Sequence, residues 1–507
     1  MPPEAAVLSP PEEVHLPPKT LGATLRKLGP GMIIAGSIVG SGELIATTKV
    51  GAEAGFWLLW LIVVGCVIKV FAQVEFGRYT IAWSQTPLQA LNAVPGPRLR
   101  GTNWIIWYWA VMTVLIISQQ GGIVGGVGQA LAISLPLTEE GRAYNEIHAE
   151  LTRARVDAAL AGMNGADAAV FAQRVEALAA QAAMIPEPSD AYLWAALVAA
   201  LTAILLYLGR YRLIQTVSTV LVIAFTAVTL LTVFFLQQTA WAVTGEEFTS
   251  GFSFGLPPAA GGIDPVATAL AAFGIIGLGA SELIMYPYWC LEKGYAKFSG
   301  VRDGTPDWIA RAKGWLRVLY TDAWLSMAVY TFATVGFYLL GAAVLWRVGL
   351  NPEGGSMIRT LAEMYVPVFG PWAHGVFLFG AFAVLYSTFF VAAAGNARMV
   401  ADGLGLFGLH DGSESTRMRW TRRISAAWPL AALAILLFVR APVGMVLASG
   451  LAQSIMLPML GIAALYFRYK RADTDLRPGR LWDIMLWLSV AGFFIVGAWS
   501  LYSALAS

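Results

Sequence analysis

The chain has 507 residues, of which 57% are hydrophobic and only 13% are charged. Soluble globular proteins carry roughly 25% charged residues, so this composition indicates a protein of the lipid bilayer. The formal net charge of +2 is too small to imply a polyanionic partner, and we expect no nucleic acid to bind. The two cysteines and four histidines form no pattern of metal ligands. We therefore expect no cofactor and no transition-metal centre.

The first 27 residues are rich in proline and lack the basic and apolar regions of a signal peptide. We interpret residues 1–27 as a disordered cytoplasmic tail and residues 28–507 as a transmembrane transporter domain. A spanning helix needs about 20 mostly apolar residues, and the sequence contains eleven such segments. They lie at about 28–50, 56–80, 103–135, 191–209, 213–237, 263–290, 317–347, 368–395, 422–440, 443–467 and 480–504.

Basic residues collect in alternate loops, whereas the loop at 244–250 is acidic. Because lysine and arginine favour the cytoplasmic side, this asymmetry puts the N-terminus in the cytoplasm. Eleven spans then put the C-terminus outside. We expect a monomer in the cytoplasmic (inner) membrane of a bacterium.

The loop at 136–190, between spans three and four, is unlike the others. It is rich in alanine with scattered glutamate and arginine, and it reads as two helices broken at Asn164-Gly165. We interpret it as an external helical insertion. The sequence leaves open whether it is a hairpin without a part in transport or a lid or docking site.

Two similar segments occupy the same place in spans one and six. Residues 40–45 read GSGELI and residues 279–284 read GASELI. Their placement predicts a five-plus-five duplication whose second half is inverted, followed by an eleventh helix. Glycine weakens a helix by about 1 kcal/mol relative to alanine, so both segments are expected to be interrupted. Paired interrupted helices mark the binding site of many secondary transporters. Close helix packing would account for the glycines but not for a glutamate in each segment.

Glu43 and Glu282 are the acidic members of this repeat. An ionisable residue in mid-span costs at least ~2.5 kcal/mol, so two at equivalent positions suggest a purpose. They could bind a hard cation through oxygen, or neutralise the dipoles of two half-helices. Ser41 and Ser281 precede them, where a helix N-cap would lie. The sequence has no pairing of a nucleophile with histidine, so we do not expect an enzyme.

Several segments resemble the Nramp family of divalent-metal transporters over residues 28–467. They include GPGMIIAGSIVGSGELIATTKVGAEAGFWLLW in spans one and two, AAAGNARMVADGLG at 392–405 and LASGLAQSIMLPMLGIAALYF at 447–467. The resemblance implies an all-α polytopic membrane protein with eleven transmembrane helices. Its fold would be the LeuT-like 5+5 inverted repeat with discontinuous helices 1 and 6.

The chain departs from the family at its metal motifs. The resemblance aligns the Asp-Pro-Gly-Asn motif of helix one with Gly40, Ser41, Gly42 and Glu43. Neither the methionine nor the histidine of the helix-six motif is evident in GASELIMYP, and a thioether is the soft ligand that favours transition metals. Acidic residues of the family's proton route align with Gln120 and Ile123, and a glutamine of helix ten with Gly450. Transition-metal transport is therefore not expected.

Three functions remain open. Glycines at the breaks could expose backbone N–H groups to a small anion, since helix N-termini favour anions. Relatives without the metal signature are expected to carry other ions, bicarbonate among them. We predict bicarbonate import coupled to Na⁺; the alternatives are a carrier of a hard divalent cation, Mg²⁺ or Mn²⁺, and a non-transporting sensor. The predicted substrate site consists of Gly40, Ser41, Gly42, Glu43, Ala280, Ser281 and Glu282.

Ser387 and Thr388 in span eight are the predicted Na⁺ site. Several LeuT-fold carriers hold Na⁺ with a hydroxyl pair of helix eight and carbonyls of helix one. The alternative is that both hydroxyls bond to their own helix. Lys69 in span two is expected to snorkel to the cytoplasmic surface. Alternatively it pairs with an acidic group or a passing anion.

Overall fold

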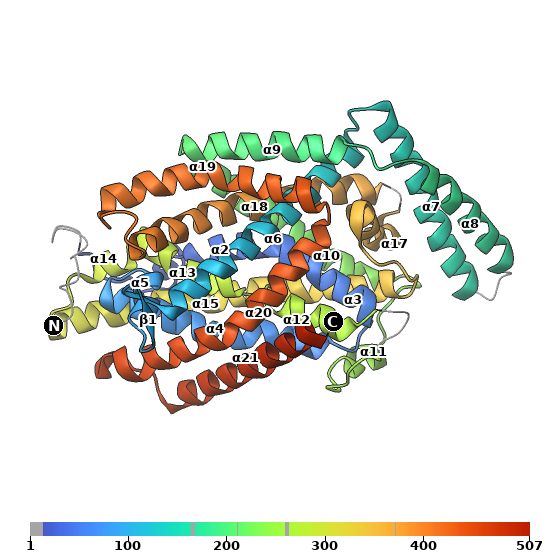
Figure 1. The fold of residues 1–507 in the computed structure, drawn as a ribbon. Coiled ribbons are helices and arrows are strands. Elements are labelled where there is room, and N and C mark those ends of the chain that lie inside the picture. The colour runs from blue at the N-terminus through green and yellow to red at the C-terminus, as the bar shows by residue number, and fades with distance from the viewer. Residues whose placement is uncertain (1–13, 164–167, 210, 259–262, 371, 507) are drawn as a thin grey trace.

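Long helices dominate the fold, because apolar chain in lipid can satisfy its backbone groups only within helices or closed barrels. The computed structural model describes residues 14–163, 168–209, 211–258, 263–370 and 372–506. Among these residues, nine helices are long and apolar enough to cross a membrane (Figure 1). The described strands, β1 (Arg98–Leu99) and β2 (Thr102–Asn103), form a small antiparallel hairpin.

The helices follow the predicted segments closely. Up to the third predicted span they are α1 (Leu21–Leu25), α2 (Pro30–Ile38), the π-helical η2 (Val39–Thr47), α3 (Thr48–Ala54), α4 (Leu59–Trp83), α5 (Pro87–Asn92) and α6 (Trp104–Ser134). From the insertion through span six they are α7 (Glu139–Met163), α8 (Ala168–Met184), α9 (Asp190–Tyr207), α10 (Tyr211–Leu236), α11 (Gly245–Ser250), α12 (Pro265–Phe273), α13 (Ala280–Lys293) and α14 (Tyr295–Ser299).

The remainder begins with the long helix of span seven. These elements are α15 (Pro306–Leu340), η3 (Gly341–Trp346), η4 (Gly354–Ser356), α16 (Met357–Ala362), η5 (Glu363–Tyr365), α17 (Val366–Phe369), α18 (Ala373–Leu406), α19 (Glu414–Val439), α20 (Pro442–Tyr466), η6 (Phe467–Arg471), η7 (Thr474–Leu476) and α21 (Arg480–Ala506). The nine long apolar helices account for nine of the eleven predicted spans. The two other predicted spans, five and six, are occupied by α10 and by the pair α12 and α13. The count of eleven spans stays a prediction.

Span six is interrupted, as its glycines predict. Helix α12 begins with Pro265 in its first turn, capped by the Asp264 side chain, and ends at Phe273. Residues 274–279 are not helical, and α13 starts at Ala280. Gly277 has a φ of +58°, a left-handed conformation that side chains other than glycine rarely adopt.

Span one differs from the expected break. The chain stays helical from α2 through α3, but η2 between them is wound as a π-helix. Such widened turns are often found at functional sites. All nine residues of η2 are buried, and η2 packs against α12, α15, α18 and α20. The two repeated segments therefore meet in the centre of the bundle. The first lies in a π-helical stretch of span one, and the second lies at the interruption of span six.

The N-terminal segment is ordered over the part that the structure describes. The backbone N–H of His15 donates to Phe298 O, and Trp315 Nε1 donates to His15 O at 3.0 Å. The predicted disorder therefore does not extend over 14–27, whereas residues 1–13 lie outside the described residues.

The insertion forms two paired helices, α7 and α8, which project from the bundle (Figure 1). Its predicted break at Asn164-Gly165 lies outside the described residues. Arg359 of α16 ties the insertion to the bundle by donating to the backbone and side-chain oxygens of Asn145, each at 2.8 Å.

Candidate ion site between spans one and six

Glu43 reaches from η2 across to the interruption in span six. Its side chain is 0% exposed, and Oε1 accepts hydrogen bonds from Gly277 N and Thr334 Oγ1, each at 3.0 Å. The second carboxylate oxygen, Oε2, is buried and has no hydrogen-bond partner within the described chain. A buried acceptor without a hydrogen bond is energetically costly, and a bound ligand would offset that cost. This oxygen is therefore available to a ligand.

Glu282 lies in the first turn of α13 and is 8% exposed. Its Oε2 accepts a hydrogen bond from Ser281 Oγ at 2.8 Å. This position lets Glu282 neutralise the dipole of α13, which was one of the two roles that the sequence suggested for both glutamates. Glu43 cannot have this role, since it lies within a continuous helix. The two carboxylates are related by the repeat, but their surroundings differ.

The expected N-caps are not formed. The N-cap of α13 is Gly279, and neither α13 nor η2 has a side-chain cap. Instead, Ser41 Oγ accepts from Gln119 Nε2 at 3.1 Å, and the backbone N–H of Ser281 donates to Gln453 Oε1 at 3.0 Å. Both serines thus belong to a network between helices.

Gln119 and Gln453 complete that network. Gln453 Nε2 donates to Gln119 Oε1 at 2.8 Å, and Ser449 Oγ donates to the same oxygen at 3.1 Å. Helices three and ten are thereby joined to both halves of the repeat. The sequence comparison pointed to Gln120 and Gly450 and missed these two amides. Polar residues within apolar spans were the signal that could have found them.

Backbone N–H groups at the interruptions already have partners. Gly40 N donates to Thr388 Oγ1 at 3.0 Å, Gly277 N donates to Glu43, and Ala280 N donates to Gly274 O at 3.2 Å. Ser281 N is likewise bonded to Gln453. An anion site was expected to have backbone N–H groups without partners, and these amides all have one. The group that remains available at the site is an acceptor, Glu43 Oε2.

Ser387 and Thr388 project from α18 onto span one. The Thr388 hydroxyl donates to Gly36 O at 3.2 Å and accepts from Gly40 N, so it replaces the bond that an α-helix would make between these two residues. Ser387 Oγ also donates to Gly36 O, at 3.5 Å. The alternative that both hydroxyls bond to their own helix is therefore wrong, while Na⁺ binding here stays a prediction.

Lys69 is 0% exposed, so the expectation that it snorkels to the surface is wrong. Its ammonium donates to Phe273 O and to Ile276 O, the latter at 2.8 Å. It also lies 4.7 Å from the centroid of the Phe273 ring. The side chain thus satisfies one carbonyl at the C-terminal end of α12, where helix carbonyls lack partners and the dipole is negative, and one carbonyl of the interruption that follows.

The groups around the interruptions are hard ligands. Carboxylate, amide, hydroxyl and carbonyl oxygens suit Mg²⁺, Ca²⁺ and Mn²⁺ rather than softer metals. The Met285 thioether lies against α18, because a Cβ added to Gly395 would meet Met285 Sδ at 2.2 Å. Within the described ranges, no three His, Cys, Asp or Glu side chains are grouped so that they could hold a metal ion.

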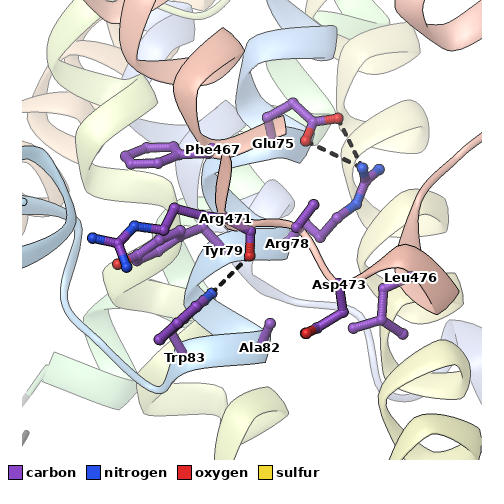
Figure 2. A pocket seen from close by; sticks show the side chains of 10 residues that line it. Glu75, Arg78, Tyr79, Ala82, Trp83, Phe467, Arg471, Asp473 and Leu476 are labelled. Atoms are coloured by element: carbon purple, nitrogen blue, oxygen red, sulfur yellow. Dashed lines mark hydrogen bonds and ion pairs between the residues drawn. The ribbon is translucent and has the colours of Figure 1, made fainter. Parts of the chain in front are cut away.

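Figure 2 shows a second buried ionic group, formed by Glu75 and Arg78 of α4. Arg78 Nη1 is 2.9 Å from Glu75 Oε1, and Trp482 Nε1 donates to the same oxygen at 2.6 Å. Figure 2 also shows the Trp83 side chain donating to the backbone oxygen of Arg471, at 3.1 Å. Since the charges of Glu75 and Arg78 are paired, we interpret this cluster as structural.

Span one contains a π-helix, span six is interrupted, and acidic residues are buried where the two meet. This arrangement defines an integral membrane protein of the secondary-transporter class. The chain matches the family model described as natural resistance-associated macrophage protein-like over residues 141–503. It belongs to this family, Nramp, and is a transporter of a small ion rather than an enzyme. The match begins after span three, so it leaves out the place of the family's helix-one metal motif.

Solved structures confirm the LeuT-like fold. The Eremococcus coleocola manganese transporter matches with a TM-score of 0.58 at 16% identity, over 97% of this chain and 89% of that one. MhsT in complex with L-phenylalanine matches with a TM-score of 0.51 at 14% identity, over 94% of this chain and 97% of that one. An uncharacterized protein of Pasteurella multocida (strain Pm70) is 22% identical over 481 residues, covering 94% of this chain and 90% of the relative.

Proposed function

We propose that this protein carries a hard divalent cation, Mg²⁺ or Mn²⁺, through a site between spans one and six. The observation that carries the proposal is the buried oxygen Glu43 Oε2, which has no partner in the described chain and lies beside the interruption of span six. Mg²⁺ keeps several waters and is usually held by one or two carboxylates. Glu43 and Glu282 would supply them.

Two further observations support a cation. The backbone donors that an anion would need are used within the protein, at Gly40, Gly277 and Ser281. Membership of a family of metal-ion transporters agrees, as does the fold shared with a manganese transporter. The absence of a thioether from this set of ligands favours hard cations over transition metals that prefer sulfur.

Bicarbonate import coupled to Na⁺ is the second candidate. Lys69 favours it, since a buried ammonium near the interruptions could attract an anion. Its two bonds to carbonyls weaken this argument, because they use two of the three donors of the ammonium. Ser387 and Thr388 remain the proposed place for Na⁺ in that candidate.

The remaining sequence predictions complete the proposal. We propose a monomer in a bacterial inner membrane, with the N-terminus in the cytoplasm and the C-terminus outside. The distribution of basic loops supports this orientation. The paired helices α7 and α8 would then lie on the outer side of that membrane.

Flux into proteoliposomes distinguishes the two candidates. Vesicles containing a metal-sensitive dye should respond to external Mg²⁺ or Mn²⁺ with wild-type protein, and Glu43→Gln should need a roughly 10- to 150-fold higher metal concentration for the same response. Glu246→Gln, which changes an exposed glutamate of α11, is the matched control and should keep wild-type flux. Internal alkalinisation that needs both Na⁺ and bicarbonate, without any metal response, would instead establish the anion carrier.

A further inference from the structure

A cavity of about 510 Å³ lies among the ends of four spans. Its lining comes from the end of α9, the last two turns of α13, the second half of α18 and the first half of α19. In the proposed orientation these parts of the helices lie toward the cytoplasm. None of the described residues that line the cavity belongs to the candidate ion site, so the two are separate features.

The lining carries an excess of positive charge. Its charged members among the described residues are three arginines and one glutamate, namely Arg398, Arg417, Arg422 and Glu292. Three positive charges against one negative charge leave an excess of two. Such a lining repels the divalent cation proposed as cargo and attracts an anion. Positive charge held within a membrane protein is costly unless an anion compensates it.

The three arginines differ in the contacts that they already make. Arg398 is paired with Glu292, with 3.1 Å between Nη2 and Oε2. Arg422 donates from Nε to Tyr207 O at 2.7 Å, and its guanidinium lies 4.4 Å from the centroid of the Tyr207 ring. The half-buried Arg417 side chain makes no hydrogen bond or ion pair within the described chain. Its guanidinium is therefore available to a ligand beside that of Arg422.

Phosphate is the anion that fits such a pair of guanidinium groups. Arginine binds phosphate oxygens through two parallel N–H donors, which the ammonium of lysine cannot offer. Basic pockets between transmembrane helices on the cytoplasmic side bind the head groups of anionic lipids. The volume of about 510 Å³ also lies within the roughly 300–1,000 Å³ of ligand sites in proteins.

An apolar surface runs from the rim of the cavity along α9. Leu208 lines the cavity and is 59% exposed, and the exposed Ile204, Leu201 and Leu197 precede it at spacings of four, three and four residues. This spacing places the four side chains on one face of the helix. Helices α9 and α19 lie side by side (Figure 1). The exposed face of α9 thus offers acyl chains a surface that is continuous with the cavity.

We propose that the cavity between α9, α13, α18 and α19 binds the phosphate head group of an anionic phospholipid, with Arg417 and Arg422 as the residues that contact the phosphate. The acyl chains lie along the exposed face of α9. The charge of the lining selects an anionic lipid over a zwitterionic one, because a zwitterionic head group brings no net charge to compensate the arginines. The inference does not depend on which ion the protein carries.

Thermal unfolding of the full-length protein in detergent tests the site, because a ligand that binds the folded state raises the unfolding temperature. Phosphatidylglycerol, phosphatidylcholine and inorganic phosphate would be titrated separately. We expect phosphatidylglycerol to raise the unfolding temperature of the wild type in a saturable way. Phosphatidylcholine and inorganic phosphate at the same concentrations should leave it unchanged.

Substitutions on α19 locate the effect. Arg417→Gln should need a roughly tenfold higher phosphatidylglycerol concentration for half of the effect, since one charged hydrogen bond is lost. Arg417→Lys keeps the charge and should lose less. Arg423→Gln, which changes an exposed arginine of the same helix outside the lining, is the matched control and should behave as the wild type. Because Arg417 has no side-chain partner in the described chain, its variants should unfold at the wild-type temperature without lipid.

Three results would overturn the proposal. Equal stabilisation by phosphatidylcholine would show that the lipid acts without its charge. Equal shifts in Arg417→Gln and Arg423→Gln would show that only the net charge of the surface matters. Stabilisation by inorganic phosphate that lipid does not increase would establish a site for a free anion instead. Should Arg417→Gln not fold, the two lipids on the wild type and the Arg417→Lys variant still decide between these results.

Discussion

Replacing Glu43 by glutamine and by alanine separates its part in the fold from its part in ion binding. The glutamine side chain can keep an oxygen in the place of Oε1, which accepts from Gly277 N and Thr334 Oγ1. The bonds become weaker because the acceptor is neutral, but a buried charge is also removed. We expect Glu43→Gln to unfold at nearly the wild-type temperature.

Alanine removes the acceptor altogether. The Thr334 hydroxyl can still donate to Tyr330 O, which lies 2.6 Å away, so the loss falls mainly on the amide of Gly277. An orphaned buried donor costs about 1–3 kcal/mol, and Glu43→Ala should lose at least that much stability. For ion binding, either change removes a charged contact worth about 1.5–3 kcal/mol, or roughly a 10- to 150-fold weaker affinity.

The assay combines thermal unfolding in detergent with metal uptake by proteoliposomes at several Mg²⁺ concentrations. Glutamine should weaken uptake without loss of stability, whereas alanine should impair both. If Glu43→Gln takes up Mg²⁺ with wild-type affinity, Glu43 is not a ligand. If Glu43→Ala is as stable as the wild type, the hydrogen bond to span six does not contribute as argued.

Further substitutions test the surroundings of the site. Thr388→Val should lower stability by about 1–3 kcal/mol, measured by thermal unfolding, because the hydroxyl between Gly36 and Gly40 is lost, and Thr388→Ser should restore it. Stabilisation of the wild type by Na⁺ that vanishes in Thr388→Val would support the predicted Na⁺ site. Glu75→Gln should cost about 3–5 kcal/mol by breaking a buried ion pair, whereas the exposed Glu139→Gln should change stability by less than about 0.5 kcal/mol. Gln453→Leu should weaken Mg²⁺ uptake several-fold, because Ser281 N loses its acceptor and Gln119 a donor.

The place of the candidate site in the fold could be proposed from the sequence because the features that define it are residue types. Glycines indicate the interruption, and the buried Glu43 and Glu282 are the acidic side chains beside it. The interruption of span six is also a local effect of the sequence, since Gly277 adopts a left-handed conformation. Among the described residues, nine of the eleven predicted spans are helices long and apolar enough to cross a membrane, and these followed from apolar length alone.

What could not be predicted depends on contacts between distant segments. Span one stays helical because Thr388, far along the chain, supplies the missing bond to Gly40. Lys69 is buried because the last residue of α12 and the interruption that follows it present carbonyls to it. Gln119 rather than Gln120 joins the network, a choice set by about 100° of rotation around one helix. A polar residue within an apolar span draws attention to itself, but the local sequence does not show which distant group it contacts.

The position of a bound Mn²⁺ ion tests the central claim most directly. Crystals grown with Mn²⁺ and measured for its anomalous scattering should show one peak between η2 and the start of α13, within about 2.0–2.6 Å of Glu43 Oε2. The peak should be missing in Glu43→Gln crystals grown in the same way. A Mn²⁺ peak elsewhere in the molecule, unaffected by that substitution, would contradict the account.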